Sequence, residues 1–193
     1  MPDKIKSAIF ISGRGSNMMA LVDAARAADF PLEYVVVVAN DPEAGGLEWA
    51  RQQGIEAIAI SHRDFNKDRE AHEKAIDSEL RKRGVEFICL AGYMRILTPW
   101  LVGQWSGKMI NIHPSLLPKY KGLHTHERAI EAGDTEHGAS IHWVNAGVDD
   151  GEVILQARVP ILDGDTPDAL AARVLAQEHQ LYPAAVRKIF SAL

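Results

Sequence analysis

The chain has 193 residues, of which 47% are hydrophobic and 24% charged, and it carries a formal net charge of −5 at pH 7. This length and apolar content suit one domain with a sizeable core. The mild negative charge argues against a nucleic-acid-binding protein, and without a run of about 18 apolar residues no membrane span is predicted.

Short apolar runs alternate with amphipathic segments through the first 113 residues. Strands are expected at 5–12, 32–39, 55–61, 85–92 and 108–113. Helices are expected at 18–28, 45–53 and 68–83. The second strand has four consecutive valines, which indicates burial on both of its faces. Strands that alternate with helices predict an α/β fold with a doubly wound, mostly parallel, Rossmann-like sheet.

The pattern changes after residue 123. A helix is expected at 124–132, and two strands at 138–145 and 152–161 would form an antiparallel C-terminal hairpin. Thr166 and Pro167 have the N-cap and first-turn residue types, so the last helix should begin there. It should run towards Tyr182, with a kink or a restart at Pro183. No repeat or linker is visible, and we expect a single domain over residues 1–193.

The number of cysteines and the first residues of the chain indicate in which cellular compartment the protein is expected. The one cysteine, Cys89, lies within an apolar run and is expected to be a core residue in a reducing cytoplasm. A single cysteine excludes an intrachain disulfide and a cysteine-rich metal site. The first six residues are charged and show no signal-peptide pattern, so a cytoplasmic protein is expected.

The segment 111–122 carries the most informative polar residues. Side chains alternate along a strand, so Asn111 and His113 should point to the same face, and Pro114 then ends regular pairing. An amide donor beside an imidazole suits acyl-transfer chemistry, in which one group binds a developing oxyanion and the other handles a proton. The alternative is a polar strand end whose side chains are simply satisfied.

A glycine-containing turn, Ser12-Gly13-Arg14-Gly15-Ser16-Asn17, joins the first strand to the first helix. Glycines allow a tight turn, and the free N–H groups that begin a helix bind anions. The segment lacks the third spaced glycine of a dinucleotide fingerprint and the Gly-Lys-Ser/Thr of a P-loop. It is interpreted as a phosphate site, with a plain strand-to-helix turn as the alternative.

The exit of the fourth strand contains Met94, Arg95, Ile96 and Leu97. If the fourth and fifth strands are neighbours, this exit lies beside Asn111. The apolar side chains would then line a pocket for a flat aromatic ring, and the arginine would lie near a carboxylate or a phosphate of the ligand. An ordinary strand-to-helix junction is the alternative.

Four other polar residues are considered as possible members of a functional site. A carboxylate of Asp149 beside His113 would orient the imidazole and raise its pKa, although acidic residues are also common in turns. Glu178 would either reach a substrate amine or lie on an exposed helix face. No carboxylate or cysteine stands at ligand spacing from His124 and His126, so no metal is expected there.

Taken together, these motifs resemble the folate-dependent formyltransferases, and most closely those that formylate glycinamide ribonucleotide. The resemblance is carried by 12–17, 91–97, 111–126, 148–151 and 177–179, and it covers nearly the whole chain. The sequence departs from the family at Asp150-Gly151-Glu152, usually Gly-Gly-Pro, and at Lys121, often proline. We expect these departures to change loop stiffness more than chemistry.

The resemblance implies that 10-formyltetrahydrofolate, as co-substrate, gives its formyl group to the amine of 5-phosphoribosylglycinamide, without a metal, in de novo purine biosynthesis. It implies three catalytic residues: Asn111, His113 and Asp149. The implied ribonucleotide contacts are Gly15, Ser16, Asn17 and Glu178. The implied folate contacts are Arg69, Met94, Arg95, Ile96, Leu97, Asn111 and Val144. It further implies small-molecule substrates, no nucleic-acid or membrane partner, and a monomer or weak homodimer.

Three other functions remain open. A 10-formyltetrahydrofolate hydrolase has a similar core but usually an N-terminal regulatory domain, whereas a strand is expected here by residue 5. A methionyl-tRNA formyltransferase normally adds a C-terminal RNA-binding domain, whereas this acidic chain stops soon after its last helix. A non-catalytic phosphate-binding domain would explain 13–17 but not Asn111, His113 and Asp149 together.

Overall fold

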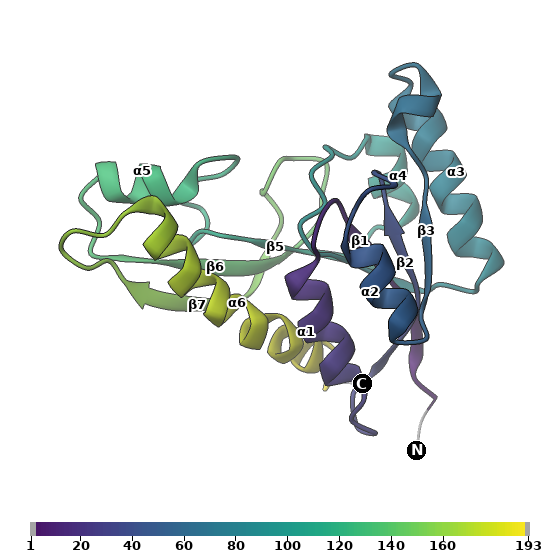
Figure 1. The fold of residues 1–193 in the computed structure, drawn as a ribbon, viewed down its shortest axis with the longest axis horizontal. Helices are drawn as coiled ribbons and strands as arrows, with labels where there is room; N and C mark the ends of the chain where they lie inside the picture. Colours follow the sequence, from purple (N-terminus) through teal and green to yellow (C-terminus); the bar gives the residue numbers. More distant parts are fainter. Residues whose placement is uncertain (1–2, 192–193) are drawn as a thin grey trace. The chain divides into compact units, whose positions relative to one another are not determined.

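The computed structural model describes residues 3–191. Its contacts divide the chain into two units, Met1–Ile110 and Asn111–Leu193 (Figure 1). Within residues 3–191, no helix is both long enough and apolar enough to cross a membrane.

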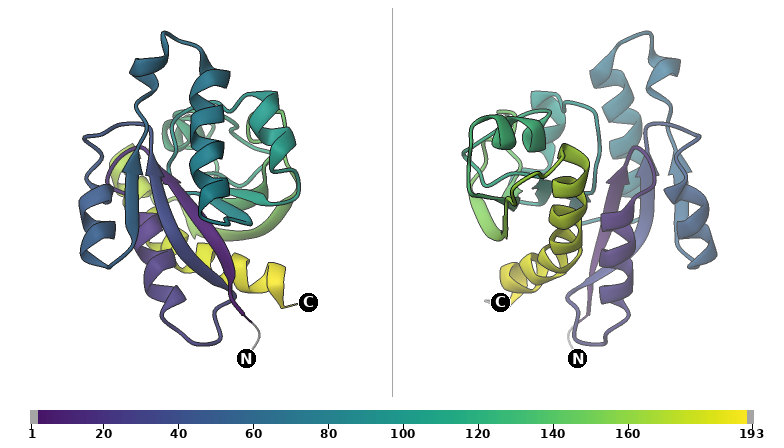
Figure 2. Two further views of the ribbon diagram at one scale, coloured as in Figure 1. Left: turned by 90° about the vertical axis from the view of Figure 1, so that its right-hand side faces the viewer. Right: turned by 60° about the vertical axis from the view of Figure 1, so that its left-hand side comes forward.

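The first unit is built of parallel strands covered by helices. Its strands pair in the order β3-β2-β1-β4, all parallel. They are β1 (Ile5–Ile11), β2 (Leu32–Ala39), β3 (Glu56–Ala59) and β4 (Phe87–Leu90). The helices are α1 (Ser16–Ala25), α2 (Gly46–Gln52), α3 (Arg69–Lys82) and α4 (Pro99–Gln104), with a 3₁₀ turn η1 (His62–Phe65). Helices α1 and α2 lie on one side of the strands and α3 on the other (Figure 2).

The apolar strand runs explain this layering. In β1, Ala8, Ile9, Phe10 and Ile11 are all fully buried, so both faces of the strand are covered, as they are in β2. A strand that buries both faces needs helices on both sides. Cys89 in β4 is fully buried, which confirms its expected place in the core.

The second unit combines an antiparallel hairpin with two helices. Strand β6 (Glu136–Trp143) pairs antiparallel with β7 (Val153–Pro160), and α6 (Pro167–Phe190) packs against this hairpin (Figure 1). Helix α5 (Thr125–Glu131) contacts α6. Strand β5 (Met109–His113) spans the boundary between the units, and its last three residues belong to the second.

The expected α/β class, with a parallel sheet and a C-terminal antiparallel hairpin, is confirmed. The predicted start of the last helix is also confirmed, because the Thr166 hydroxyl accepts a hydrogen bond of 3.1 Å from the Ala169 amide. That residues 1–193 act as one domain stays a prediction.

Several boundaries differ from the sequence prediction. Helix α1 begins at Ser16 and ends at Ala25, whereas 18–28 was expected. Helix α6 does not restart at Pro183, because buried Tyr182 and Val186 pack on either side of the proline and stabilise the helix beyond it. The turn η1 and helix α4 were not expected, since elements of four and six residues are too short to show a helical period.

Candidate functional site

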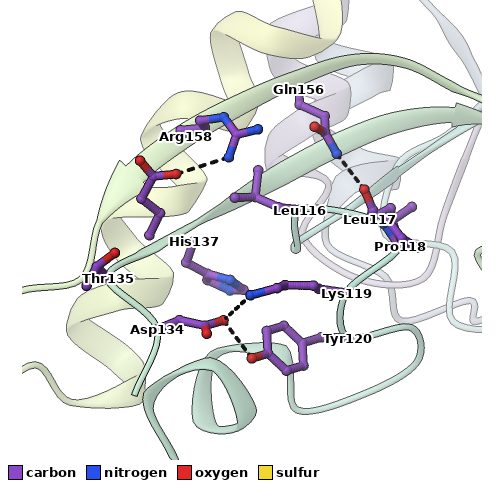
Figure 3. Close-up of a pocket in the computed structure, with 11 residues that line it drawn as sticks. Leu116, Leu117, Pro118, Lys119, Tyr120, Asp134, Thr135, His137, Gln156 and Arg158 are labelled. Atoms are coloured by element: carbon purple, nitrogen blue, oxygen red, sulfur yellow. Dashed lines mark hydrogen bonds and ion pairs between the residues drawn. The ribbon is translucent and has the colours of Figure 1, made fainter. Parts of the chain in front are cut away.

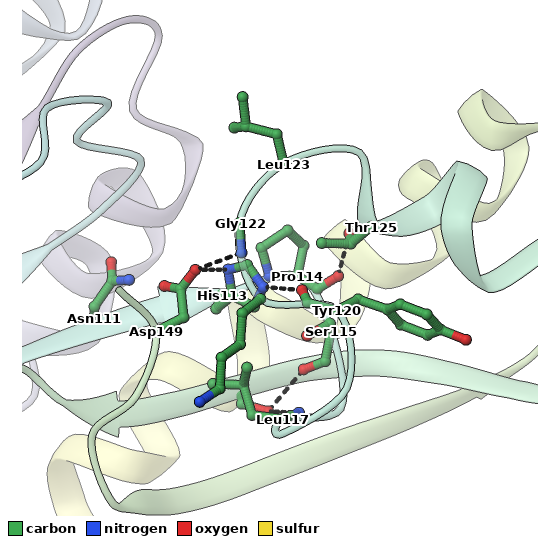
Figure 4. Close-up of polar contacts among 12 residues, drawn as sticks. Asn111, His113, Pro114, Ser115, Leu117, Tyr120, Gly122, Leu123, Thr125 and Asp149 are labelled. Atoms are coloured by element: carbon green, nitrogen blue, oxygen red, sulfur yellow. Dashed lines mark hydrogen bonds and ion pairs between the residues drawn. The ribbon is translucent and has the colours of Figure 1, made fainter. Parts of the chain in front are cut away.

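The second unit gathers a polar cluster at the end of β5. His113 Nδ1 lies 3.3 Å from Asp149 Oδ2, and His142 Nε2 lies 3.6 Å from the other carboxylate oxygen. Asn111 Nδ2 lies 3.2 Å from His142 Nε2. His113 and His142 are 5% and 3% exposed, so the cluster is largely shielded from water. The structure thus brings together Asn111, His113 and Asp149 (Figure 4).

His142 contacts the Asn111 amide. Its Nδ1 lies 2.9 Å from the Trp143 carbonyl oxygen, which can only accept, so Nδ1 carries a proton. Nε2 lies 3.2 Å from Asn111 Nδ2 and can accept from this amide when it carries no proton. One N–H of Asn111 is used in this way, and the second can meet a substrate oxygen.

Sequence reasoning did not select His142. A usable signal exists, because Ser140 and His142 stand two residues apart in a strand that is buried from His137 to His142. Polar side chains at alternate positions of a buried strand share one face and need partners.

The carboxylate of Asp149 is held by its backbone and by a loop amide. Its φ of 48° is in the left-handed region, and Oδ2 accepts a hydrogen bond of 2.9 Å from the Gly122 N–H (Figure 4). Burial acts to raise the pKa of Asp149, but His142, the Gly122 amide and His113 outweigh it and leave the pKa below its ordinary value. The group is therefore an anion at neutral pH.

Burial dominates the pKa of His113. Loss of water lowers this pKa, the Tyr120 carbonyl and Asp149 raise it, and His142 and Arg128 lower it further. The net pKa lies below 6.5. The expectation of a raised pKa is wrong in its net direction, because desolvation of the imidazolium exceeds the attraction of Asp149.

The loop after β5 is anchored at several points. Ser115, which is fully buried, donates a hydrogen bond of 2.6 Å to the Lys119 carbonyl oxygen. Ser140 donates to the Ser115 carbonyl at 2.7 Å and accepts from the Leu117 amide at 3.1 Å. Gln156 donates to the Leu117 carbonyl at 2.9 Å. These bonds hold the loop that supplies the Gly122 amide.

The two positions at which the sequence departs from the family contact each other. Lys121 Nζ pairs with the Asp150 carboxylate, and both side chains are substantially exposed. The Asp150 carboxylate is thus engaged by Lys121, while the Asp149 carboxylate faces His113. That only the first of these neighbouring acids acts in catalysis stays a prediction.

The first unit has a cavity of about 310 Å³ at the start of α1. It is lined by Ser12, Gly13, Arg14, Gly15, Ser16, Asn17, Ala91, Gly92 and Met94. Gly15 has a φ of 74°, and a Cβ there would lie 2.9 Å from Met18 Cε. The turn therefore favours glycine, and its residues line this cavity at the N-terminus of α1, where helix amides can bind an anion.

The exit of β4 is tied to this turn. The Ser12 hydroxyl accepts a hydrogen bond of 2.8 Å from the Met94 amide and donates one of 2.6 Å to Asn40 Oδ1. Beyond it, Met94 and Ile96 are 69% and 60% exposed. Neighbouring apolar side chains that both face water form a patch of the kind that marks ligand-binding grooves.

The other residues that the sequence predicts as ligand contacts lie at several places in the fold. Arg69 is the exposed first residue of α3, Arg95 and Leu97 are partly exposed beyond β4, and Val144 directly follows β6. Glu178 is 7% exposed in α6. Their roles towards a ligand stay predictions.

His124 and His126, at which no metal was expected, each contact another side chain. His126 Nδ1 lies 3.1 Å from His137 Nε2, and His124 Nδ1 lies 3.6 Å from Glu127. In residues 3–191 no group of three or more His, Cys, Asp or Glu side chains is placed to hold a metal ion.

Known proteins resemble the chain over nearly its full length. The model of the formyl transferase family matches residues 5–186. The phosphoribosylglycinamide formyltransferase of Haemophilus influenzae is 44% identical, over 94% of this chain and 85% of that one. The Escherichia coli phosphoribosylglycinamide formyltransferase is 46% identical, over 91% and 82%.

A larger protein and a solved structure extend the comparison. The trifunctional purine biosynthetic protein adenosine-3 of Drosophila pseudoobscura is 47% identical over 95% of this chain, but the chain spans only 14% of its length. The crystal structure of phosphoribosylglycinamide formyltransferase from Brucella melitensis matches with a TM-score of 0.92 at 48% identity, covering 99% of this chain and 97% of that one. The chain therefore belongs to the formyl transferase family.

Proposed function

We propose that the protein transfers the formyl group of 10-formyltetrahydrofolate to the amine of 5-phosphoribosylglycinamide. The products are formylglycinamide ribonucleotide and tetrahydrofolate, and the reaction belongs to purine biosynthesis in the cytoplasm. The names and coverage of the similar bacterial enzymes support this assignment. The observation that carries it is the buried pair of His113 Nδ1 and Asp149 Oδ2 at 3.3 Å, linked through His142 to Asn111.

The proposed reaction needs no enzyme nucleophile. The substrate amine attacks the formyl carbon, a new C–N bond forms, and the bond to the folate nitrogen breaks. Asn111 donates its second amide N–H to the oxyanion of the tetrahedral intermediate, and His113, whose ring nitrogens face Tyr120 and Asp149, stabilises the oxyanion through its charge when it is protonated. One proton leaves the amine and one reaches the folate nitrogen, and Asp149 assists this transfer through His113 or a water molecule.

The first unit is proposed to supply binding groups. The turn of Gly15, Ser16 and Asn17 binds the ribose phosphate, because it presents helix amides to a cavity. The exposed apolar side chains of Met94 and Ile96 contact the flat folate ring. The other proposed folate contacts are Arg69, Arg95, Leu97, Asn111 and Val144. Glu178 is proposed to meet the glycinamide group.

The hydrolase alternative is not favoured, because the bacterial relatives that match over most of their own length are named transferases. A direct assay separates the two. Conversion of 10-formyltetrahydrofolate is measured with and without 5-phosphoribosylglycinamide. Transfer predicts turnover only when the amine is present, and an equal rate without the amine would contradict the proposal.

A further inference from the structure

The catalytic-site imidazole is flanked by two hydrogen-bond acceptors. His113 Nε2 lies 2.7 Å from the Tyr120 carbonyl oxygen, and Nδ1 lies 3.3 Å from Asp149 Oδ2 (Figure 4). The carbonyl and the ionised carboxylate both accept only. A neutral imidazole has one N–H and can satisfy only one of them. The shorter contact indicates that this proton lies on Nε2, so that Nδ1 gains and loses the exchangeable proton.

The Tyr120 carbonyl depends on an unusual backbone conformation. Tyr120 has a φ of 55°, in the left-handed region that non-glycine residues rarely adopt. Such a conformation persists when surrounding contacts hold it.

The Tyr120 side chain is anchored on Asp134. The phenol donates a hydrogen bond of 2.6 Å to Asp134 Oδ2, and Lys119 Nζ lies 3.1 Å from the same oxygen (Figure 3). The Arg128 guanidinium lies 5.2 Å from the ring centre, and the His137 ring packs against it edge-on at 6.3 Å. The phenol hydrogen bond also lowers the pKa of Asp134, so this acceptor is ionised at neutral pH.

We propose that Tyr120, anchored on Asp134, is a positioning residue that keeps its carbonyl against His113 Nε2 and so reserves Nδ1, opposite Asp149, for proton exchange. Its bearing on catalysis rests on the proposed function, whereas the proton position does not. Asp134 acts as a second positioning residue, through Tyr120.

Five other residues near His113 affect the charge of its ring or respond to that charge. Asp149, His142 and Arg128 act on its charge, and His126 and His137 sense its charge in turn. Variants should therefore leave these five residues unchanged. Tyr120→Phe removes only the phenol hydrogen bond, and Asp134→Ala removes its acceptor.

The direct test is ¹⁵N NMR of the His113 ring in the ligand-free protein across a pH titration. In the parent protein the neutral ring should carry its proton on Nε2. In Tyr120→Phe and Asp134→Ala the Nδ1–H tautomer should gain population, and the pKa should fall because the imidazolium loses an acceptor. A neutral parent ring protonated on Nδ1 would overturn the proposal before any variant is made.

Two further variants separate anchoring from general structural damage. Lys119→Met removes the other contact to Asp134 and should leave the tautomer unchanged. Asp134→Asn keeps an acceptor oxygen for the phenol and should restore the parental tautomer. Parental spectra in both Tyr120→Phe and Asp134→Ala would contradict the proposal.

Kinetic measurements test whether the positioning of His113 by Tyr120 affects the reaction. Tyr120→Phe should lower kcat roughly 10-fold with little change in KM, because a misplaced proton-transfer group slows chemistry more than binding. The pH profile should move in the same direction as the NMR pKa. If the parent shows the expected tautomer but no amine-dependent transfer, the proposed function fails while the positioning role stands.

Discussion

The cluster around His113 and the turn at the start of α1 use their polar groups in opposite ways. In the cluster, the ring nitrogens of His113 and His142 face protein partners, and the Asp149 carboxylate accepts from the Gly122 amide. At the turn, Gly15 and its neighbours line an open cavity of about 310 Å³. Groups that act on a transition state benefit from being held beforehand, whereas a binding surface stays open until its ligand arrives.

This contrast separates two kinds of variant. Changes in the cluster should reduce the rate of the chemical step with little effect on affinity. Changes in the turn, or in the apolar surface beyond β4, should reduce the affinity for one substrate with little effect on the rate at saturation.

The largest effect is expected for Asp149→Asn. This change preserves shape and removes the charge that faces His113, so turnover should fall roughly 10²- to 10⁴-fold while both substrates still bind. Asp150→Asn is the matched control and should stay within a few-fold of the parent, since that carboxylate pairs with Lys121. Near-normal turnover in Asp149→Asn, or a collapse only in Asp150→Asn, would show that the wrong carboxylate was assigned.

A smaller loss, in affinity rather than rate, is expected for Gly15→Val. The φ of 74° disfavours a β-branched residue, and a Cβ would lie 2.9 Å from Met18 Cε. Calorimetry should show roughly 10- to 100-fold weaker binding of 5-phosphoribosylglycinamide, with folate binding retained. Gly45→Ala is the control, because no atom lies within 4 Å of a Cβ there. Equal ribonucleotide affinity in a folded Gly15→Val protein would refute the phosphate placement.

The buried histidines of the second unit should make stability depend on pH. Burial, with a contribution from His126, lowers the pKa of His137 from 6.5 to about 4. Below pH 6.5 the unfolded chain binds a proton that folded His137 excludes, so stability present above pH 6.5 is lost as the pH falls towards 4. The loss attributable to His137 should reach about 2 kcal/mol at pH 5.

Urea unfolding at pH 7, 6 and 5 measures this loss. His137→Gln should flatten the pH dependence of the free energy of unfolding. His124→Gln, which changes a side chain that is 75% exposed, should keep the parental dependence. An unchanged slope in His137→Gln would contradict the assignment.

The smallest effect is expected at the apolar surface of the first unit. Met94→Glu places a charge where the folate ring is proposed to pack, and it should weaken folate binding about tenfold because the carboxylate loses water. Met94 is 69% exposed, so folding should survive. Leu162→Glu, at another exposed apolar side chain, is the control. Loss of both ligands in folded Met94→Glu would mean that the two binding regions are not separate.

Local patterns predicted much of this architecture. Apolar runs located every strand, and residue types at helix ends located Thr166 as an N-cap. Strand alternation placed Asn111 and His113 on one face, and the position of Asp149 beside them followed from the family resemblance. These features depend on residues close in sequence or on motifs that recur in a family.

The remaining features depend on tertiary packing. The contact between Asn111 and His142 joins residues 31 positions apart. The hydrogen bond from Tyr120 to Asp134 joins residues 14 positions apart, and no sequence motif indicated the left-handed backbone of Tyr120. The direction of the His113 pKa depends on how completely the ring is buried, and a single sequence does not report that burial. The sequence therefore predicted the residues of the cluster better than their electrostatics.

The central claim is that Asp149 raises the pKa of the buried His113 imidazole. An NMR titration of His113 in the parent protein and in Asp149→Asn tests this claim most directly. Burial should hold the parental pKa below 6.5, and loss of the carboxylate should lower it further, because the imidazolium then loses its nearest anion. A pKa in Asp149→Asn equal to or above the parental value would contradict the account.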